Sequence, residues 1–158
     1  MLKTTRTSFE KAKRNIILFA LINCACYIVF MLIVKYTTLL HVAGMSTINY
    51  AILAILSIVQ VKSLAKQEIH FPFLEVFSVT IVTGTISFFL FSAFLFFYSF
   101  FDPYLNNLYI MDIEYTPRLA PPLLMFFEGS GISVIIGLIT MEYAGWQREK
   151  GDKKFKDQ

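Results

Sequence analysis

The sequence contains little of what catalysis or metal binding requires. It has only two histidines, His41 and His70, and no H-x-x-E, C-x-x-C or G-x-S-x-G pattern. The topology derived below puts the two histidines on opposite sides of a membrane, so they do not form one metal site. These absences argue against an enzyme, and we expect no catalytic residues, no metal and no cofactor.

Cysteine is equally scarce. Cys24 and Cys26 are the only two, and both fall inside the first apolar run. On one helix a C-x-C pair points its side chains about 200° apart, which excludes an intrahelical disulfide. A metal site would need further ligands that are missing nearby. We therefore expect two inert, buried thiols.

Charge is also in short supply. Charged residues make up 16% of the chain and hydrophobic residues 56%, against about 25% and 45–50% in soluble domains. The most apolar stretch, 74–103, has Glu75 and Asp102 as its only ionisable side chains. As a helix, Leu74 to Phe101 would be about 42 Å long, which exceeds the ~30 Å hydrocarbon core of a bilayer. The composition predicts an integral membrane protein in contact with lipid and not with nucleic acid.

Four apolar segments divide the chain. They predict an all-α integral membrane protein with transmembrane helices at about 15–36, 42–61, 74–101 and 122–146. Asp102-Pro103 ends the third helix, because the residue before a proline disfavours helical geometry. An outer loop, 102–121, then leads to Pro121-Pro122, which suit the first turn of the fourth helix.

Basic residues gather at the two ends of the chain. The segment 1–14 is predicted to be a basic amphipathic lead-in with a capping box at Thr7–Glu10, 15–146 the transmembrane domain and 147–158 a basic tail. With the connection between the second and third spans, twelve of the fourteen Lys and Arg lie on one side, against Lys35 and Arg118 on the other. Because basic residues accumulate in the cytoplasm, both termini are predicted to be cytoplasmic.

The basic start and first apolar run also suit a cleaved signal peptide. A run of about 22 residues is longer than the 7–15 residues of a signal-peptide core, and no A-x-A cleavage site follows it. The residues before Cys24 approach a lipoprotein signal, but Asn23 stands where a small residue is needed. We expect a retained first helix.

Small residues recur at packing distance on the third and fourth helices. In lipid, such ridges let two backbones approach closely. We expect them to pack within this protein or against a partner helix, with a substrate path as the alternative. The candidate packing residues are Thr80, Thr83, Gly84, Ser87, Gly129, Ser133 and Gly137.

Phenylalanine is concentrated in the outer half of the third helix, where it occupies eight of the fourteen positions from Phe88 to Phe101. That is too many for the interior of a four-helix unit, so several must face lipid or another protein. The candidate surface consists of Phe88, Phe91, Phe94, Phe97 and Phe101.

Two polar residues inside predicted spans form a candidate intramembrane site. Glu128 lies about six residues into the fourth helix, and an ionisable group at that depth is costly enough to indicate function. A hydrogen bond or ion pair with Lys35, His41, Asn49 or Arg118, a proton or cation site, and contact with another subunit are its alternatives. Asn23 is predicted to make an interhelical hydrogen bond.

The third helix also carries a family resemblance. A polar connection with a basic residue, a long helix rich in Phe, Ser and Thr, and the exit Phe100-Phe101-Asp102-Pro103-Tyr104 resemble the small four-helix bacterial membrane proteins of domain-of-unknown-function family 4199. The resemblance implies a multi-pass protein of the bacterial inner membrane. It implies no catalytic residue, because the family has no established activity.

Together these features favour a non-enzymatic accessory or scaffolding subunit that packs against other membrane proteins or itself. The alternative is a small homo-oligomeric transporter or channel in which Glu128, with or without Asn23, lines a path between protomers. An intramembrane enzyme is the least favoured hypothesis, because no nucleophile and base stand at a fixed spacing.

Overall fold

The computed structural model describes residues 2–37, 45–65, 73–101 and 120–156, and this part of the chain is helical. The helices are α1 (Leu2–Tyr36), α2 (Met45–Ala65), α3 (Phe73–Tyr98) and α5 (Ala120–Lys156). Each contains a segment long and apolar enough to cross a membrane, namely Ala12–Tyr36, Thr47–Leu64, Glu75–Tyr98 and Pro122–Trp146. The prediction of an all-α protein with four helices of membrane-spanning length is confirmed.

The first and last helices extend beyond the predicted spans. α1 is one helix from Leu2, so the basic lead-in continues directly into the first apolar segment. α5 continues to Lys156 through most of the predicted tail. Neither extension contains proline, and both are rich in lysine, a good helix former, so α5 continues past Gly151.

The boundaries of α2 and α3 differ by a few residues from the predicted spans 42–61 and 74–101. α2 begins at Met45 and ends at Ala65, and α3 ends at Tyr98. After Tyr98 the backbone tightens, because Phe100 N donates to Phe97 O at 3.2 Å and Phe101 N donates to Tyr98 O at 3.0 Å. Such i→i−3 hydrogen bonds are typical of a tapering helix end, and Pro103 follows shortly after.

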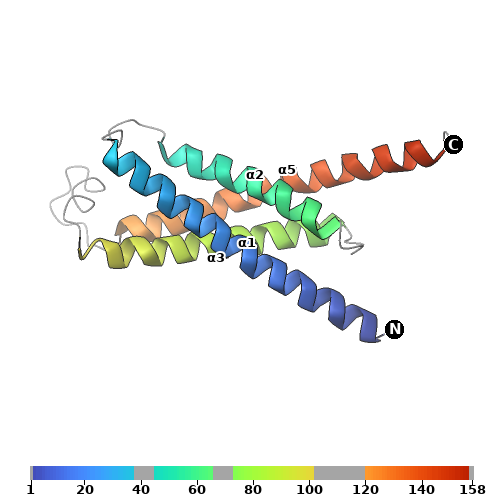
Figure 1. Ribbon diagram of the computed structural model, residues 1–158, viewed down its shortest axis with the longest axis horizontal. Coiled ribbons are helices and arrows are strands. Elements are labelled where there is room, and N and C mark those ends of the chain that lie inside the picture. The colour runs from blue at the N-terminus through green and yellow to red at the C-terminus, as the bar shows by residue number, and fades with distance from the viewer. Residues whose placement is uncertain (1, 38–44, 66–72, 102–119, 157–158) are drawn as a thin grey trace.

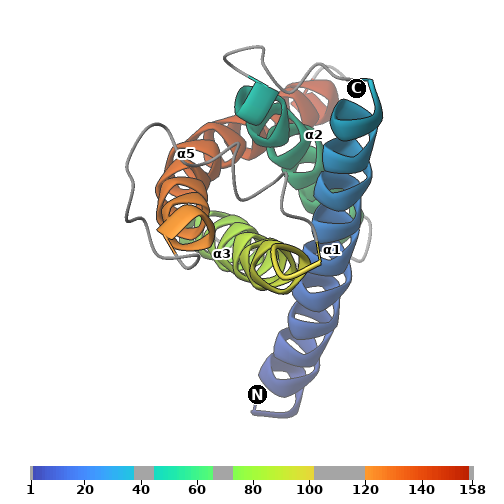
Figure 2. The same ribbon diagram turned by 90° about the vertical axis from the view of Figure 1, so that its left-hand side faces the viewer.

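The four helices pack in the cyclic order α1, α2, α5, α3, seen along the bundle in Figure 2. The α3–α5 pair makes the most extensive contact, whereas α2 and α3, although consecutive, are diagonal and touch little. The start of α1 and the end of α5 lie at the same end of the bundle, here called the terminal end (Figure 1). The opposite end, where α1 finishes and α5 begins, is the loop end.

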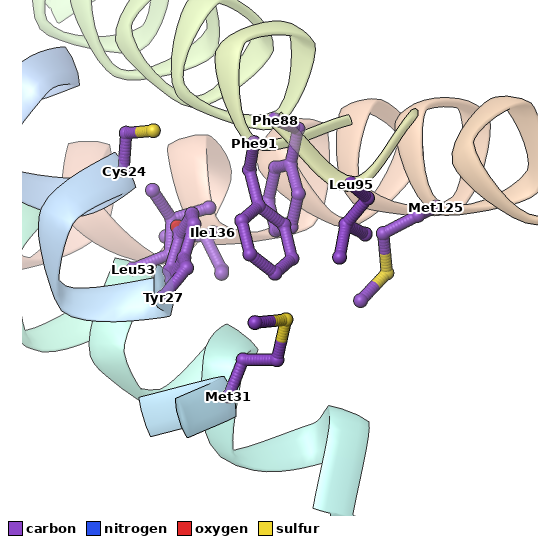
Figure 3. Packing of buried hydrophobic residues seen from close by; sticks show 9 residues of the cluster. All are labelled: Cys24, Tyr27, Met31, Leu53, Phe88, Phe91, Leu95, Met125 and Ile136. Carbon is purple, nitrogen blue, oxygen red and sulfur yellow. The ribbon is translucent and has the colours of Figure 1, made fainter. Parts of the chain in front are cut away.

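Two hydrophobic clusters fill the interior. The larger one lies toward the loop end and is built around Tyr27, whose ring stacks on Phe88 at 5.0 Å and meets Phe91 edge-on at 5.5 Å. Figure 3 shows these rings side by side, with methionine and leucine side chains around them. Its members are Cys24, Tyr27, Met31, Leu53, Phe88, Phe91, Leu95, Met125 and Ile136. The smaller cluster, toward the terminal end, consists of Ala12, Val61, Leu64, Val76 and Val79.

Candidate functional site

Four of the predicted packing residues, the three glycines and Ser133, lie in the contact between α3 and α5, whereas Thr83 contacts α2 and Ser87 contacts α1. A Cβ added to Gly84 would come 2.7 Å from the Cβ of Ser133, and one added to Gly129 would overlap the ring of Phe88. A Cβ on Gly137 would meet Phe77 at 3.1 Å. The glycines therefore set the distance between the two helices. All seven candidates are buried, namely Thr80, Thr83, Gly84, Ser87, Gly129, Ser133 and Gly137.

Four buried hydroxyl groups of α3 and α5 find acceptors on their own helices, whereas buried Ser92 on α3 donates to the carbonyl of Pro122 on α5. Thr80 donates to the carbonyl of Val76 at 3.0 Å, and Ser133 donates to that of Gly129 at 2.7 Å. The remaining donors of this kind are Ser87 to Gly84 O at 2.8 Å and Thr140 to Ile136 O at 2.7 Å. Back-bonding of this kind satisfies a buried hydroxyl locally, so these four side chains need no partner from another helix.

The predicted phenylalanine surface is wrong at two of its five positions. Phe88 and Phe91 are fully buried in the larger cluster, and Phe94 is partly buried against it. Phe97 and Phe101 are exposed, at 64% and 86%. The physical reason is helical periodicity: residues at i, i+3 and i+7 share one face, so Phe88, Phe91 and Leu95 point together into the bundle.

Glu128 faces outward on α5. Its carboxylate accepts a hydrogen bond from the hydroxyl of Tyr50 on α2, which is not one of the four predicted partners. Of those four, Lys35 donates to the Tyr98 hydroxyl at 2.9 Å and Asn49 is buried. His41 and Arg118 lie outside the described residues.

Glu128 and Asn23 do not form one site. Asn23 is buried inside the bundle on α1, whereas Glu128 is exposed on α5, and these two helices are diagonal (Figure 2). The predicted joint site is therefore corrected to two separate environments. The expected interhelical bond of Asn23 also needs revision, because its Oδ1 has no hydrogen-bond partner within the described part of the chain.

Gln60 is a buried polar residue outside the predicted candidate site. Its side chain is fully buried on α2 and its Nε2 donates to Thr83 Oγ1 at 2.9 Å, across the diagonal of the bundle. The sequence contains a pattern that indicates its burial. Three- and four-residue intervals separate Leu53, Ser57, Gln60 and Leu64. Such spacing defines one helix face, and all four residues are indeed buried.

Gln60 belongs to a polar layer that crosses all four helices between the two hydrophobic clusters. Each of its six side chains is at most 1% exposed. The helices meet at this level, because the Tyr27 hydroxyl, one turn from Asn23, lies beside Ser87 and Gly84 packs on Ser133. The polar layer consists of Asn23, Ser57, Gln60, Thr83, Ser87 and Ser133.

Several buried polar atoms have no hydrogen-bond partner among the described residues. An unsatisfied buried group costs about 1–3 kcal/mol, so each needs an explanation. Six of the seven such atoms belong to α1 and α2. They are Asn15 Oδ1, Asn23 Oδ1, Tyr27 OH, Asn49 Oδ1, Ser57 Oγ and Gln60 Oε1, and the seventh is Ser130 Oγ on α5.

Within the described residues, no group of three His, Cys, Asp or Glu side chains is arranged to hold a metal ion. Cys24 and Cys26 are free thiols, the first buried and the second partly buried. No protein-family model, curated protein or solved structure matches the chain. The resemblance to family 4199 therefore stays a prediction, and the function is argued from these two polar environments.

Proposed function

We propose that the protein is a multi-pass membrane protein that acts as a non-enzymatic accessory or scaffolding subunit. In this proposal a transmembrane helix of another protein docks on the α2–α5 face around Glu128. The observation that carries it is the outward position of Glu128 within the membrane-length segment Pro122–Trp146. At 1.5 Å per residue, Glu128 lies about 9 Å from the start of that segment.

A carboxylate on the outer surface of a helix bundle is poorly placed if lipid surrounds it. Ionisable groups inside a membrane almost always face a bundle interior or water, because transfer into hydrocarbon is costly. The hydrogen bond from Tyr50 uses only part of the acceptor capacity of a carboxylate, which has about four lone-pair sites. A partner helix that brings Lys, Arg or a neutral donor would supply further hydrogen bonds and exclude lipid.

The face around Glu128 also has a shape that suits a helix. Gly131 is exposed one turn further along α5, and a Cβ added there would meet no atom within 4 Å. Ala51 is exposed beside Tyr50 on α2. Small residues let a partner backbone approach closely, while Leu124 and Ile135, both exposed on α5, provide apolar contact on either side.

The proposed orientation places both termini in the cytoplasm. Its support is the twelve basic residues on one side of the predicted spans against two on the other. The start of α1 and the end of α5 at one end of the bundle (Figure 1) fit this orientation. Placement in a bacterial inner membrane rests on the family resemblance.

Site-specific photocrosslinking in native membranes tests the docking proposal. A photoreactive residue at Ile135 probes the α2–α5 face, and one at Val29 on α1 is the matched control, because both side chains are 55% exposed. We expect a distinct heterologous crosslink at Ile135 and none at Val29. Glu128→Leu should abolish the crosslink, while Glu128→Gln should retain part of it through hydrogen bonding.

Two results would overturn the proposal. Equal labelling at Ile135 and Val29, or labelling of lipid alone at both, would mean that the α2–α5 face is ordinary lipid-facing surface. A crosslink to a second copy of this chain alone would replace the accessory role with self-association. Monomeric protein as the sole species after mild solubilisation would agree with the first of these results.

The small homo-oligomeric transporter or channel stays the alternative, with Glu128 as its residue on the path between protomers. Asn23 does not join Glu128 on such a path in this arrangement of the helices, because Asn23 is buried inside its own bundle and Glu128 is exposed on α5.

A further inference from the structure

We infer that the polar layer is an internal binding site for a small neutral hydrogen-bond donor, with water as the simplest occupant. The inference rests on Asn23 Oδ1, Ser57 Oγ and Gln60 Oε1, which are buried and have no hydrogen-bond partner among the described residues. It does not depend on the docking face around Glu128. The two sites lie in different parts of the bundle and can be tested separately.

The three oxygens belong to one level of the bundle. Ser57 and Gln60 are one turn apart on α2, and Gln60 is tied to Thr83 by its hydrogen bond. Thr83 is one turn from Ser87, which lies beside the Tyr27 hydroxyl, and Tyr27 is one turn from Asn23. These steps connect α1 and α2, which also pack directly on each other.

No side chain of the described residues, the nearby Tyr27 hydroxyl included, donates a hydrogen bond to these three oxygens. The hydroxyl groups of Ser87 and Ser133 already donate to carbonyls of their own helices. The Nε2 of Gln60 donates to Thr83. A bound water donates two hydrogen bonds and typically makes about three in all within a protein, so it matches a set of acceptors from two adjacent helices.

The occupant is neutral. No Asp, Glu, Lys or Arg is among the buried side chains of the described residues. An ion held in this layer would lack a compensating charge, and an unpaired buried charge is strongly unfavourable. The hydrophobic clusters on both sides of the layer also favour a small molecule that enters when the bundle opens.

Two buried serines provide a matched stability test. Ser57 and Ser133 are both fully buried and both lie inside helices, so Ser→Ala gives each the same gain in helix propensity. Ser133 bonds to its own backbone, whereas the Ser57 hydroxyl has no partner among the described residues. If Ser57 holds a bound donor, Ser57→Ala lowers the unfolding temperature by about 2–4 °C more than Ser133→Ala.

Nuclear magnetic resonance identifies the occupant. In lipid nanodiscs, with the side-chain amides of Asn and Gln labelled with ¹⁵N, bound water gives cross-peaks at the water frequency to Asn23 and Gln60. A retained polar solute gives cross-peaks at another frequency and an added mass in native mass spectrometry. Both outcomes support the site, and they distinguish the two sources of the donor.

The inference fails if the layer is dry. In that case both amides show cross-peaks only to the protein, and Ser57→Ala raises the unfolding temperature, because it removes a buried hydroxyl that has no partner. Asn23→Leu is a second check. If a donor is bound to Asn23, Asn23→Leu lowers the unfolding temperature of the protein. If no donor is bound, the same substitution raises it.

Discussion

The two sides of the bundle bury polar groups in different ways. On α3 and α5 the buried hydroxyls of Thr80, Ser87, Ser133 and Thr140 bond to carbonyls of their own helices, and Gly84 and Gly129 bring the backbones together. On α1 and α2 lie six of the seven buried polar atoms that have no partner among the described residues. The α3–α5 pair is therefore held by close packing, whereas α1 and α2 bury polar atoms that can still form hydrogen bonds.

The chemistry of the side chains explains the difference. A Ser or Thr hydroxyl reaches the carbonyl three or four residues earlier, so it can be buried at little cost. A carboxamide has an acceptor oxygen and two donor hydrogens, which its own helix cannot satisfy together. Carboxamides on α1 and α2 therefore account for four of the six unpaired atoms on that side, those of Asn15, Asn23, Asn49 and Gln60, and the hydroxyls of Tyr27 and Ser57 are the other two.

The largest expected effect lies at the aromatic centre of the α3–α5 pair. Phe88→Ala removes a fully buried ring that stacks on Tyr27 and packs against Gly129. Loss of such a ring costs about 3–5 kcal/mol of unfolding free energy, measured by denaturant titration in mixed micelles. The control is Phe97→Ala on the exposed face of the same helix, for which we expect a change below about 0.5 kcal/mol. If Phe88→Ala and Phe97→Ala lower the unfolding free energy equally, Phe88 and Phe97 do not lie on a buried and an exposed face of α3.

The next effect tests whether the glycines set the distance between α3 and α5. Gly84→Ala places a Cβ 2.7 Å from the Cβ of Ser133, and overpacking of this kind costs about 1–3 kcal/mol. Gly131→Ala is the control, because a Cβ there meets open space and alanine stabilises a helix by up to about 1 kcal/mol.

A second change identifies the cause of that loss. Removal of the opposing Cβ, in Gly84→Ala with Ser133→Gly, should recover part of the stability, and a double-mutant cycle measures the coupling. If the two substitutions are additive, the loss at Gly84 does not come from contact with Ser133. In that case Gly84 would not set the distance between α3 and α5, and the two sides of the bundle would not differ in this respect.

The sequence predicted the helices and the α3–α5 ridge because both depend on local properties. Hydropathy and length define four spans, and small residues at helical spacing mark Gly84 and Ser133 without knowledge of the partner helix. The rotation of α3 was harder to predict, because Phe88 and Phe97 are chemically identical and only packing separates them. The hydrogen bond between Gln60 and Thr83 depends on diagonal helices, which hydropathy does not reveal.

An effect of the same order is expected at that diagonal bond, which joins the two sides of the bundle. Thr83→Val keeps the volume but removes the acceptor of Gln60 Nε2, and an unpaired buried donor costs about 1–3 kcal/mol. Thr80→Val is the matched control, since the Thr80 hydroxyl bonds only to the carbonyl of Val76. If the two variants lose the same stability, the diagonal bond adds nothing beyond local back-bonding.

The smallest effect is expected at the loop end, where Lys35 on α1 reaches Tyr98 on α3. The Lys35 ammonium donates to the Tyr98 hydroxyl at 2.9 Å and lies 5.2 Å from the centre of its ring. Tyr98→Phe removes the hydrogen bond but keeps the ring contact, so we expect a loss of about 0.5 kcal/mol or less in the same titration. Tyr98→Leu removes both interactions and should cost more. A loss at Tyr98→Phe as large as that at Thr83→Val would mean that a partly exposed contact joins the two sides as strongly as the buried Gln60–Thr83 bond.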